Sequence, residues 1–319
     1  MKRLIVFDYI RTISVIGIVL CHCCYGLSGL AFAGSFLGTT FNVVFLTLSA
    51  FLLGLSWEKK GKKAYGLSFL THRISKLAYS YYPFLLVMFA FLAFTGFHVT
   101  IKDWLMHFLF LPWFDKLPGF GHLWFITMIV ICYLGVLFVS RFQIVNKCKM
   151  GGVILAVLSQ CVLGRLGLPN YMFLYLFLYV MVFLNAKQIL EYVGKLRIST
   201  IAIVGGLLIA GVLYLFYANM MNKYTSVWGG MISAISFFMM SYLIFKNANE
   251  NKVIGFISSI SFEIYLVHHV FCFGQFSLFK VVENPILGIS AILLLSVALA
   301  YPLHLIGNRI SIIVNRITK

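Results

Sequence analysis

The sequence contains little charge, and acidic residues are especially few. Charged residues make up 10% of the 319 positions, with 8 Asp and Glu against 25 Lys and Arg. Soluble domains usually carry about 25% charged residues. Hydrophobic residues make up 62% here, and the mean hydropathy is +0.99. This composition excludes a water-soluble globular protein and predicts an all-α protein that crosses a membrane several times.

Cysteine spacing argues against two classes of site. Most of the 7 cysteines lie in apolar segments, so a disulfide framework is not expected. Adjacent helical side chains point about 100° apart, so the run Cys21-His22-Cys23-Cys24 cannot close around one ion without other ligands. We therefore expect no metal and no bound cofactor.

The net charge of +17 does not indicate a nucleic-acid partner, because the cations are spread between the apolar runs. The N-terminus is not expected to be a cleaved signal peptide either. Asp8 and Arg11 interrupt its apolar run, and no small-residue cleavage site follows. Residues 4–25 are thus predicted to be a retained first span.

About 20 apolar residues are needed to cross a bilayer as a helix, and the sequence predicts about ten such spans. They lie near residues 4–25, 38–57, 78–97, 122–140, 151–167, 170–186, 199–217, 228–245, 253–273 and 286–307. The fifth and sixth are short and meet at a turn over residues 167–170, which predicts a helical hairpin. Residues 102–113 are too short to cross and are predicted to form an interfacial helix. We expect one transmembrane domain over residues 1–319, with no appended soluble domain.

The distribution of cations predicts which side the loops face. With ten spans, nineteen of the 25 Lys and Arg residues fall in the termini and loops of one side, and five fall on the other. Since cytoplasmic loops carry the excess of Lys and Arg, both termini are predicted to be cytoplasmic.

Three costly side chains lie inside the first apolar segment. A charged group at mid-bilayer costs at least about 2.5–3.5 kcal/mol, so such groups usually face a cavity or a partner. Asp8 and Arg11 are three residues apart and within reach of each other. His22 follows Arg11 by eleven residues, on nearly the same helix face and about 16 Å along the axis. Arg11 could bind an anionic group, and His22 could act as a general base.

Structural roles are the alternatives to a functional site for these three residues. Asp8 and Arg11 could simply extend toward the cytoplasmic headgroups. A single His22 is equally compatible with a structural polar contact.

The spacing from Asp8 and Arg11 to His22 resembles the start of acyltransferase family 3, a family of integral-membrane O-acyltransferases. Four further stretches resemble that family's motifs in the same chain order: Phe45–Phe51, Arg73–Lys76, His122–Phe125 and Ser261–His268. The chain departs from the family pattern at Ala50, where Gly is usual, and at Lys76, where Arg is usual.

The resemblance implies an enzyme of the bacterial cytoplasmic (inner) membrane that moves an acyl group from acyl-CoA to a glycan hydroxyl. The donor is most simply acetyl-CoA, used as a co-substrate, and the acceptor is a cell-surface or exported polysaccharide. His22 would be the general base or would carry the acyl group briefly. Arg11, paired with Asp8, would organise the donor.

The remaining candidate residues lie in the other motifs. Arg73 and Lys76 share a helix face before the third span and are predicted to hold the donor's phosphates. Tyr265 and His268 share a face of the ninth span, and Glu263 is a carboxylate that needs a partner there, so a structural network is the alternative for it. Three further residues are candidates for substrate binding: Ser49, His122 and Trp124. For the last two, an aromatic anchor at the membrane surface is the alternative.

Two other classes of function compete with the enzyme. A polysaccharide transporter or flippase often has helices broken near mid-span. The six prolines lie outside the predicted spans or near their ends, which argues against such breaks. A non-catalytic subunit of a glycan-secretion complex would not need the Arg11–His22 stripe. Glycine pairs at residues 205–206 and 229–230 could serve packing within this chain, with a second copy, or with a partner in glycan synthesis.

Overall fold

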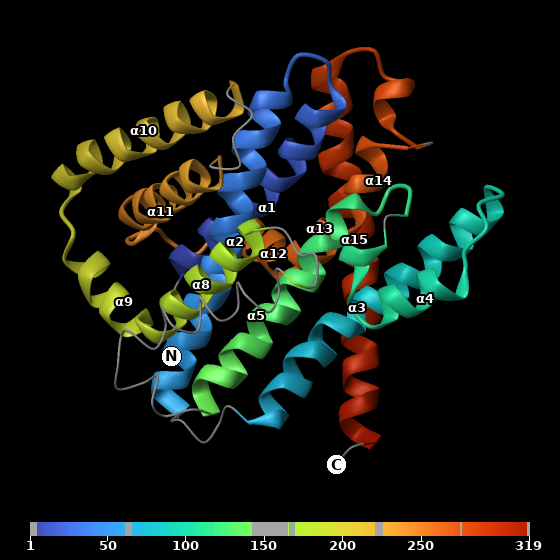
Figure 1. The fold of residues 1–319 in the computed structure, drawn as a ribbon, viewed down its shortest axis with the longest axis horizontal. Coiled ribbons are helices and arrows are strands. Elements are labelled where there is room, and N and C mark those ends of the chain that lie inside the picture. The colour runs from blue at the N-terminus through green and yellow to red at the C-terminus, as the bar shows by residue number, and fades with distance from the viewer. Residues whose placement is uncertain are drawn as a thin grey trace. The chain divides into compact units, whose positions relative to one another are not determined.

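The computed structural model describes residues 5–60, 66–115, 117–141, 165, 170–220, 226–274 and 276–317. Within these ranges every regular element is helical, either α or 3₁₀, and no strand occurs (Figure 1). The predicted all-α class is therefore confirmed.

Five described helices are long and apolar enough to cross a membrane: α1 Ile5–Gly26, α2 Ala31–Lys60, α3 Leu67–Phe94, α5 Trp124–Arg141 and α15 Pro285–Ile317. Two bent helix pairs raise the number to seven: α8 Asn170–Leu184 with α9 Ala186–Lys195, and α12 Lys252–Ser259 with α13 Ser261–Val267 and α14 His269–Cys272. Two shorter apolar stretches lie in α10 Ile201–Met220 and α11 Ser226–Phe245.

These helices coincide with nine of the ten predicted spans. The predicted fifth span at 151–167 and the turn after it lie outside the described residues, apart from position 165. The total of ten spans and the cytoplasmic location of the termini stay predictions.

The inference that no predicted span is broken is wrong. The segment over 253–273 is divided at Ile260 and again at His268, and α8 and α9 are bent by 75° at Asn185. Proline causes none of these breaks. At Asn185 the side-chain amide donates to the Met181 carbonyl at 2.8 Å, a local bond of the kind that competes with regular helix.

Pro83 and Pro302 also lie differently from the prediction. Both are in the interior of a helix, because α3 and α15 extend well beyond the predicted spans. Proline position is therefore no guide to helix breaks in this chain, and the argument against a transporter that rested on it does not hold.

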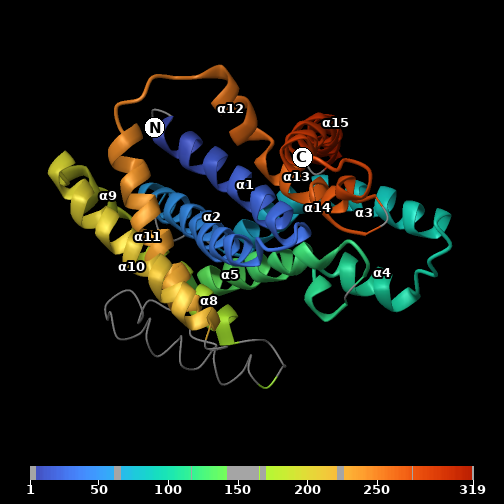
Figure 2. The ribbon, with the colours of Figure 1, turned by 90° about the horizontal axis from the view of Figure 1, so that it is seen from above.

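The chain forms two compact units, of which the first comprises residues 1–66 and 135–258. In this unit α2 contacts α1, α8, α9, α10 and α11, and α10 packs along α11 (Figures 1 and 2). The contact between α1 and α2 is close. A Cβ added at Gly38 would lie 2.8 Å from the sulfur of Cys21, so glycine permits this approach.

The second unit comprises residues 67–134 and 259–319. Its centre is the contact of α3, α13 and α15 with one another. A Cβ at Gly307 would lie 2.6 Å from Ser80 Oγ and 3.3 Å from the Tyr79 carbonyl oxygen, so α15 and α3 approach each other through glycine. The start of α15 has a strong N-cap, because Asn284 Oδ1 accepts from the amides of Ile286 and Leu287 at 2.9 and 3.2 Å.

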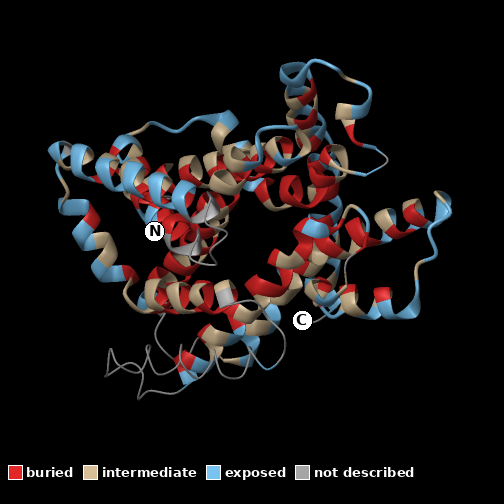
Figure 3. Cartoon of the chain, turned by 45° about the horizontal axis from the view of Figure 1, so that its top comes forward, coloured by how far each residue is buried: buried red, intermediate tan, exposed pale blue. Residues whose placement is uncertain are grey.

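The predicted interfacial helix over 102–113 is shorter in the structure, where α4 spans Ile101–Phe108 and a 3₁₀ turn, η2, spans Pro112–Phe114. Thr100 and Asp103 form a capping box at the start of α4. Phe110 then adopts φ 59°, a left-handed conformation that ends the helix and is costly for a bulky residue. Its side chain is buried against Tyr81 and Tyr82, which offsets that cost. Figure 3 shows that buried and exposed positions alternate along many of the helices.

Candidate functional site

Asp8 and Arg11 lie on α1 in the first unit, and both side chains are half-buried. Ser258 of α12 connects them. Its hydroxyl donates to Asp8 Oδ1 at 2.8 Å and accepts from Arg11 Nη1 at 3.3 Å. The predicted association of Asp8 with Arg11 is therefore present as a bridge that includes a residue 250 positions away in sequence.

Two further hydrogen bonds fix the same part of α1. Thr12 Oγ1 donates to the Ile254 carbonyl at 3.1 Å, and the Tyr9 hydroxyl donates to the Asn249 carbonyl at 3.3 Å. Asn251 caps α12 by accepting from the Val253 amide at 2.9 Å. The first three turns of α1 are thus attached to the segment that leads into α12 and to α12 itself.

His22 lies near the other end of α1 and is half-buried. Its Nδ1 lies 3.0 Å from the Ile18 carbonyl oxygen. A carbonyl can only accept, so Nδ1 carries the proton in this bond. In the neutral ring Nε2 then holds the lone pair, which makes Nε2 the atom that could accept a proton.

Ser49 on α2 bonds to a neighbouring helix. Its hydroxyl lies 2.9 Å from the hydroxyl of Tyr179 on α8, and the Tyr179 side chain is fully buried. A cavity of about 400 Å³ lies in the same unit, lined mainly by apolar side chains of α2, α8, α9 and α11, among them Phe51, Val182 and Phe238. None of the predicted site residues lines this cavity.

Arg73 and Lys76 lie in the second unit, on the first turns of α3. The Arg73 guanidinium lies 5.8 Å from the ring centroid of Phe69, and its Nε has no hydrogen-bond partner among the described residues. Lys76 is exposed one turn later. Arg73 and Lys76 thus lie one turn apart on the same helix, and their binding of the donor's phosphates stays a prediction.

Glu263 is buried between three helices of the second unit. Its Oε1 accepts from Ser80 of α3 at 2.7 Å and from Nδ1 of His304 of α15 at 3.1 Å. The structural network weighed as an alternative for Glu263 is therefore present. His304, 41 residues further along the chain, is part of it.

His122, Tyr265 and His268 come together in the second unit, and all three are buried. His122 Nε2 lies 3.0 Å from the Leu266 carbonyl, and the Tyr265 hydroxyl donates to the His122 carbonyl. Nδ1 of His268 lies 2.7 Å from the Tyr265 carbonyl. The His269 ring stacks on the His122 ring with 4.4 Å between the ring centroids. With His269, the rings of His122, Tyr265 and His268 form one cluster of four. His269 Nδ1 lies 2.8 Å from the Gly119 carbonyl oxygen. Because a carbonyl oxygen can only accept, each of the three histidines has one ring nitrogen fixed as a donor.

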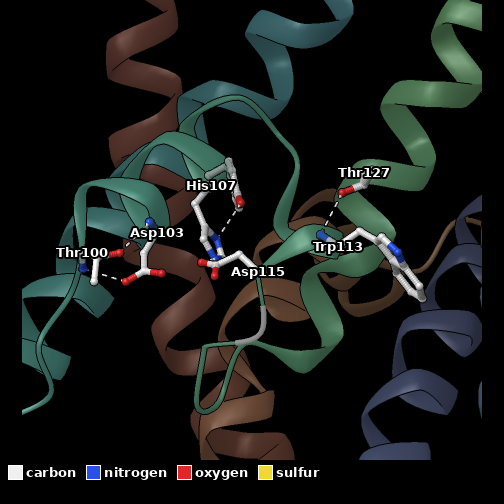
Figure 4. A network of polar contacts seen from close by, with 7 residues as sticks. Thr100, Asp103, His107, Trp113, Asp115 and Thr127 are labelled. Carbon is white, nitrogen blue, oxygen red and sulfur yellow. Dashed lines mark hydrogen bonds and ion pairs between the residues drawn. The ribbon is translucent and has the colours of Figure 1, made fainter. Parts of the chain in front are cut away.

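Trp124 begins α5 next to this cluster in sequence and is half-buried. Its ring meets Trp113 edge to face at 6.4 Å. Trp113 is itself attached to α5, since its amide donates to Thr127 Oγ1 at 3.3 Å (Figure 4).

Sequence reasoning missed a second polar network around α4, formed by Asp103, His107 and Asp115 (Figure 4). Asp103 Oδ2 accepts from the Thr100 amide at 2.6 Å, and His107 Nε2 lies 3.4 Å from Asp115 Oδ2. Burial lowers the pKa of His107 to about 4, against the opposing effect of Asp103.

The two carboxyl groups differ in this network. Burial and then the nearby Asp103 raise the pKa of Asp115. Burial also acts to raise the pKa of Asp103, but the hydrogen bonds from Thr100 outweigh it and the net pKa is lowered.

Comparison with known proteins then assigns the family. A family model described as an acyltransferase domain matches residues 4–305. The chain belongs to acyltransferase family 3. Comparisons with curated proteins and with solved structures return no match. The five motifs that carried the resemblance all lie inside the matched range, and the family identifies the chain as a multi-pass membrane acyltransferase.

The family motifs are divided between the two units. Asp8, Arg11, His22 and Ser49 belong to the first, and the motifs from Arg73 onward belong to the second. Within the described ranges, no group of three His, Cys, Asp or Glu side chains is arranged to hold a metal ion.

Several residues with close polar contacts had no signal in their local sequence. Ser258 lies in an unremarkable Ser-Ser pair, and Tyr179 is one of 17 tyrosines. The capping pattern Thr100-x-x-Asp103 is readable in the sequence, but its connection to His107 and Asp115 is not.

Proposed function

We propose that this protein is a membrane-bound O-acyltransferase, most simply an O-acetyltransferase, that moves an acyl group from acyl-CoA to a hydroxyl of a cell-surface or exported polysaccharide. Membership of the acyltransferase family supports the reaction class. The donor, the acceptor and the residue roles below are part of the proposal.

The observation that carries the chemistry is the hydrogen bond of His22. With Nδ1 donating to the Ile18 carbonyl, the neutral ring presents Nε2 as a base. A base of this kind is what acyl transfer to an alcohol needs, because the hydroxyl must lose its proton as it attacks.

The proposed step balances without an added co-reactant. Nε2 of His22 takes the proton from the acceptor hydroxyl, whose oxygen attacks the thioester carbonyl. The carbon–sulfur bond breaks, an ester forms, and the proton passes to the leaving thiolate to give free coenzyme A. A two-step variant, in which His22 carries the acyl group briefly, uses the same atom.

Cationic residues suit the donor, since coenzyme A carries several phosphates. Arg73 offers a planar guanidinium on the exposed start of α3, and Lys76 adds a second positive charge. In the first unit Arg11, which donates to Ser258, is a separate candidate for binding an anionic group of the donor. If both termini face the cytoplasm, as the cation distribution predicts, the acceptor would have to cross the bilayer to reach the cell surface.

The test compares wild type with His22→Ala and Arg11→Ala in a strain that lacks the gene. O-acyl groups on the cell-surface glycans are measured by mass spectrometry, and protein levels by blotting. We expect acylation to be lost in both variants at normal protein level. Cys24→Ala, a half-buried change two residues from His22, is the matched control and should keep acylation.

Normal acylation in both variants would contradict the proposal that the protein is the acyltransferase. The broken helices give the transporter class one supporting observation. If glycan export fails in the variants while acylation of the remaining glycan stays normal, the transporter replaces the enzyme as the better explanation.

A further inference from the structure

We propose that Ser258 is a positioning residue of the acyl-transfer site. Its hydroxyl holds the Asp8 carboxylate and, with it, fixes the Arg11 guanidinium in the orientation that binds the acyl-CoA donor. The inference rests on the proposed function, and it adds a residue from outside the motifs by which the family was identified.

The contact geometry matches what one serine hydroxyl can do. A hydroxyl has a single proton to donate and lone pairs to accept with. Ser258 gives its proton to Asp8 at 2.8 Å and accepts from Arg11 at 3.3 Å. Both roles are therefore used at once, one toward an anion and one toward a cation.

The two bonds differ in length, and this difference suggests a division of roles. The bond to Asp8 is within the usual range for hydroxyl donors, whereas the bond from Arg11 is at the long limit. Both bonds involve a charged group, so the shorter one holds Asp8 more firmly than the longer one holds Arg11. Arg11 is directed but can still shift toward an anionic ligand.

Ser258 is placed to act on side chains rather than to hold helices together. Thr12 already attaches α1 to α12 through the Ile254 carbonyl, and Tyr9 attaches α1 to the chain before α12. Ser258 is 2% exposed and its hydroxyl meets Asp8 and Arg11, whereas the adjacent Ser259 is exposed. Two residues therefore serve as controls for Ser258. Thr12 makes a bond between α1 and α12, and Ser259 is the neighbouring serine.

The experiment measures transfer of radiolabelled acetyl groups from acetyl-CoA to endogenous glycan in inverted membrane vesicles. Ser258→Ala is expected to raise the KM for acetyl-CoA about tenfold while kcat stays within about twofold, because a ground-state contact to the donor is misoriented. Thr12→Val removes a bond between α1 and α12 but not one to Asp8 or Arg11. Thr12→Val and Ser259→Ala should each leave the KM within about twofold.

A double-mutant cycle with Arg11→Lys shows whether Ser258 acts through Arg11. If it does, adding Ser258→Ala to Arg11→Lys changes the KM by less than about twofold, because the group being positioned is already altered. A full tenfold effect in that background would overturn the proposal. So would an equal KM rise in Thr12→Val, which would make Ser258 one more helix contact.

The assay also separates this inference from the proposed function. If wild-type vesicles transfer no acetyl group from acetyl-CoA, the donor assignment fails and the inference falls with it. If wild type is active and Ser258→Ala behaves like wild type, the inference alone is wrong.

Discussion

The polar residues of the two units are held in different ways. In the first unit Asp8, Arg11 and His22 are half-buried, and Asp8 and Arg11 are joined by a bridging side chain, Ser258. In the second unit Glu263 and His268 are buried, and each is bonded to a neighbouring helix or to the backbone turn beside it. Half-buried groups of the first kind are partly accessible to a ligand, whereas the buried groups of the second kind are covered by the helices around them.

This difference suggests that the first unit supplies the reacting groups and that the buried network of the second unit mainly maintains a fold. Four changes test the contrast, beginning with the largest expected effect.

Replacing His22 by Asn should abolish catalysis without unfolding the protein. Asn can still donate to the Ile18 carbonyl but provides no base, so acetyl transfer should fall by about 10²–10⁴-fold. The thermal midpoint in nanodiscs should not change. If activity survives, or if activity and stability fall together, His22 does not differ from the buried residues of the second unit.

Replacing Glu263 by Leu should have the opposite pattern. Ser80 and His304 each lose their bond to the carboxylate, and the free energy of unfolding should drop by about 3 kcal/mol. Activity per folded molecule should stay near wild type. Glu283→Gln, at an exposed carboxylate, is the control. A stable but inactive Glu263→Leu protein would give this residue a direct role in the reaction.

Removing the charges of Arg73 and Lys76 tests the cations at the start of α3 in the second unit. Each Gln substitution should raise the KM for acetyl-CoA, by about tenfold at Arg73 and less at Lys76, because only the guanidinium can bind phosphate with two parallel bonds. The effect should shrink at high salt. Lys187→Gln, at an exposed lysine on α9, should not change the KM. An unchanged KM in both the Arg73 and the Lys76 variant would remove the donor role.

The smallest expected effect concerns pH and the network around α4. The pKa of His107 is lowered from 6.5 to about 4 in the folded protein by burial. The unfolded chain therefore binds a proton between pH 6.5 and 4 that the folded chain does not. His107 thus costs no stability above pH 6.5, and stability is lost as the pH falls toward 4.

His107→Gln should remove this loss, which amounts to about 2 kcal/mol at pH 5. Thermal midpoints of wild type and variant at pH 7.5 and pH 5 measure it. His98→Gln, at an exposed histidine before α4, should follow wild type at both pH values. If the thermal midpoint of His107→Gln fell between pH 7.5 and pH 5 as much as that of wild type, other groups would cause the acid sensitivity.

Much of the helical architecture could be predicted because it depends on local composition. A run of apolar residues must form a helix in a bilayer, since the backbone has no other way to satisfy its polar groups. Nine predicted spans coincide with described helices for this reason. The breaks at Asn185 and Ile260 could not be predicted, because no proline marks either of them. At Asn185 the break is accompanied by a side-chain bond to the Met181 carbonyl.

The sequence by itself determined the membrane class, the family and the residues that are costly in an apolar span. Asp8, Arg11 and His22 stand out because a charged or titratable group in a hydrophobic run is costly unless it has a partner or faces a cavity. Only the tertiary structure decided which partners compensate them. Ser258 joins Asp8 to Arg11 across 250 positions, and Ser80 and His304 enclose Glu263. A hydrogen bond depends on distance in space, and no local pattern encodes which of many serines will be brought within it.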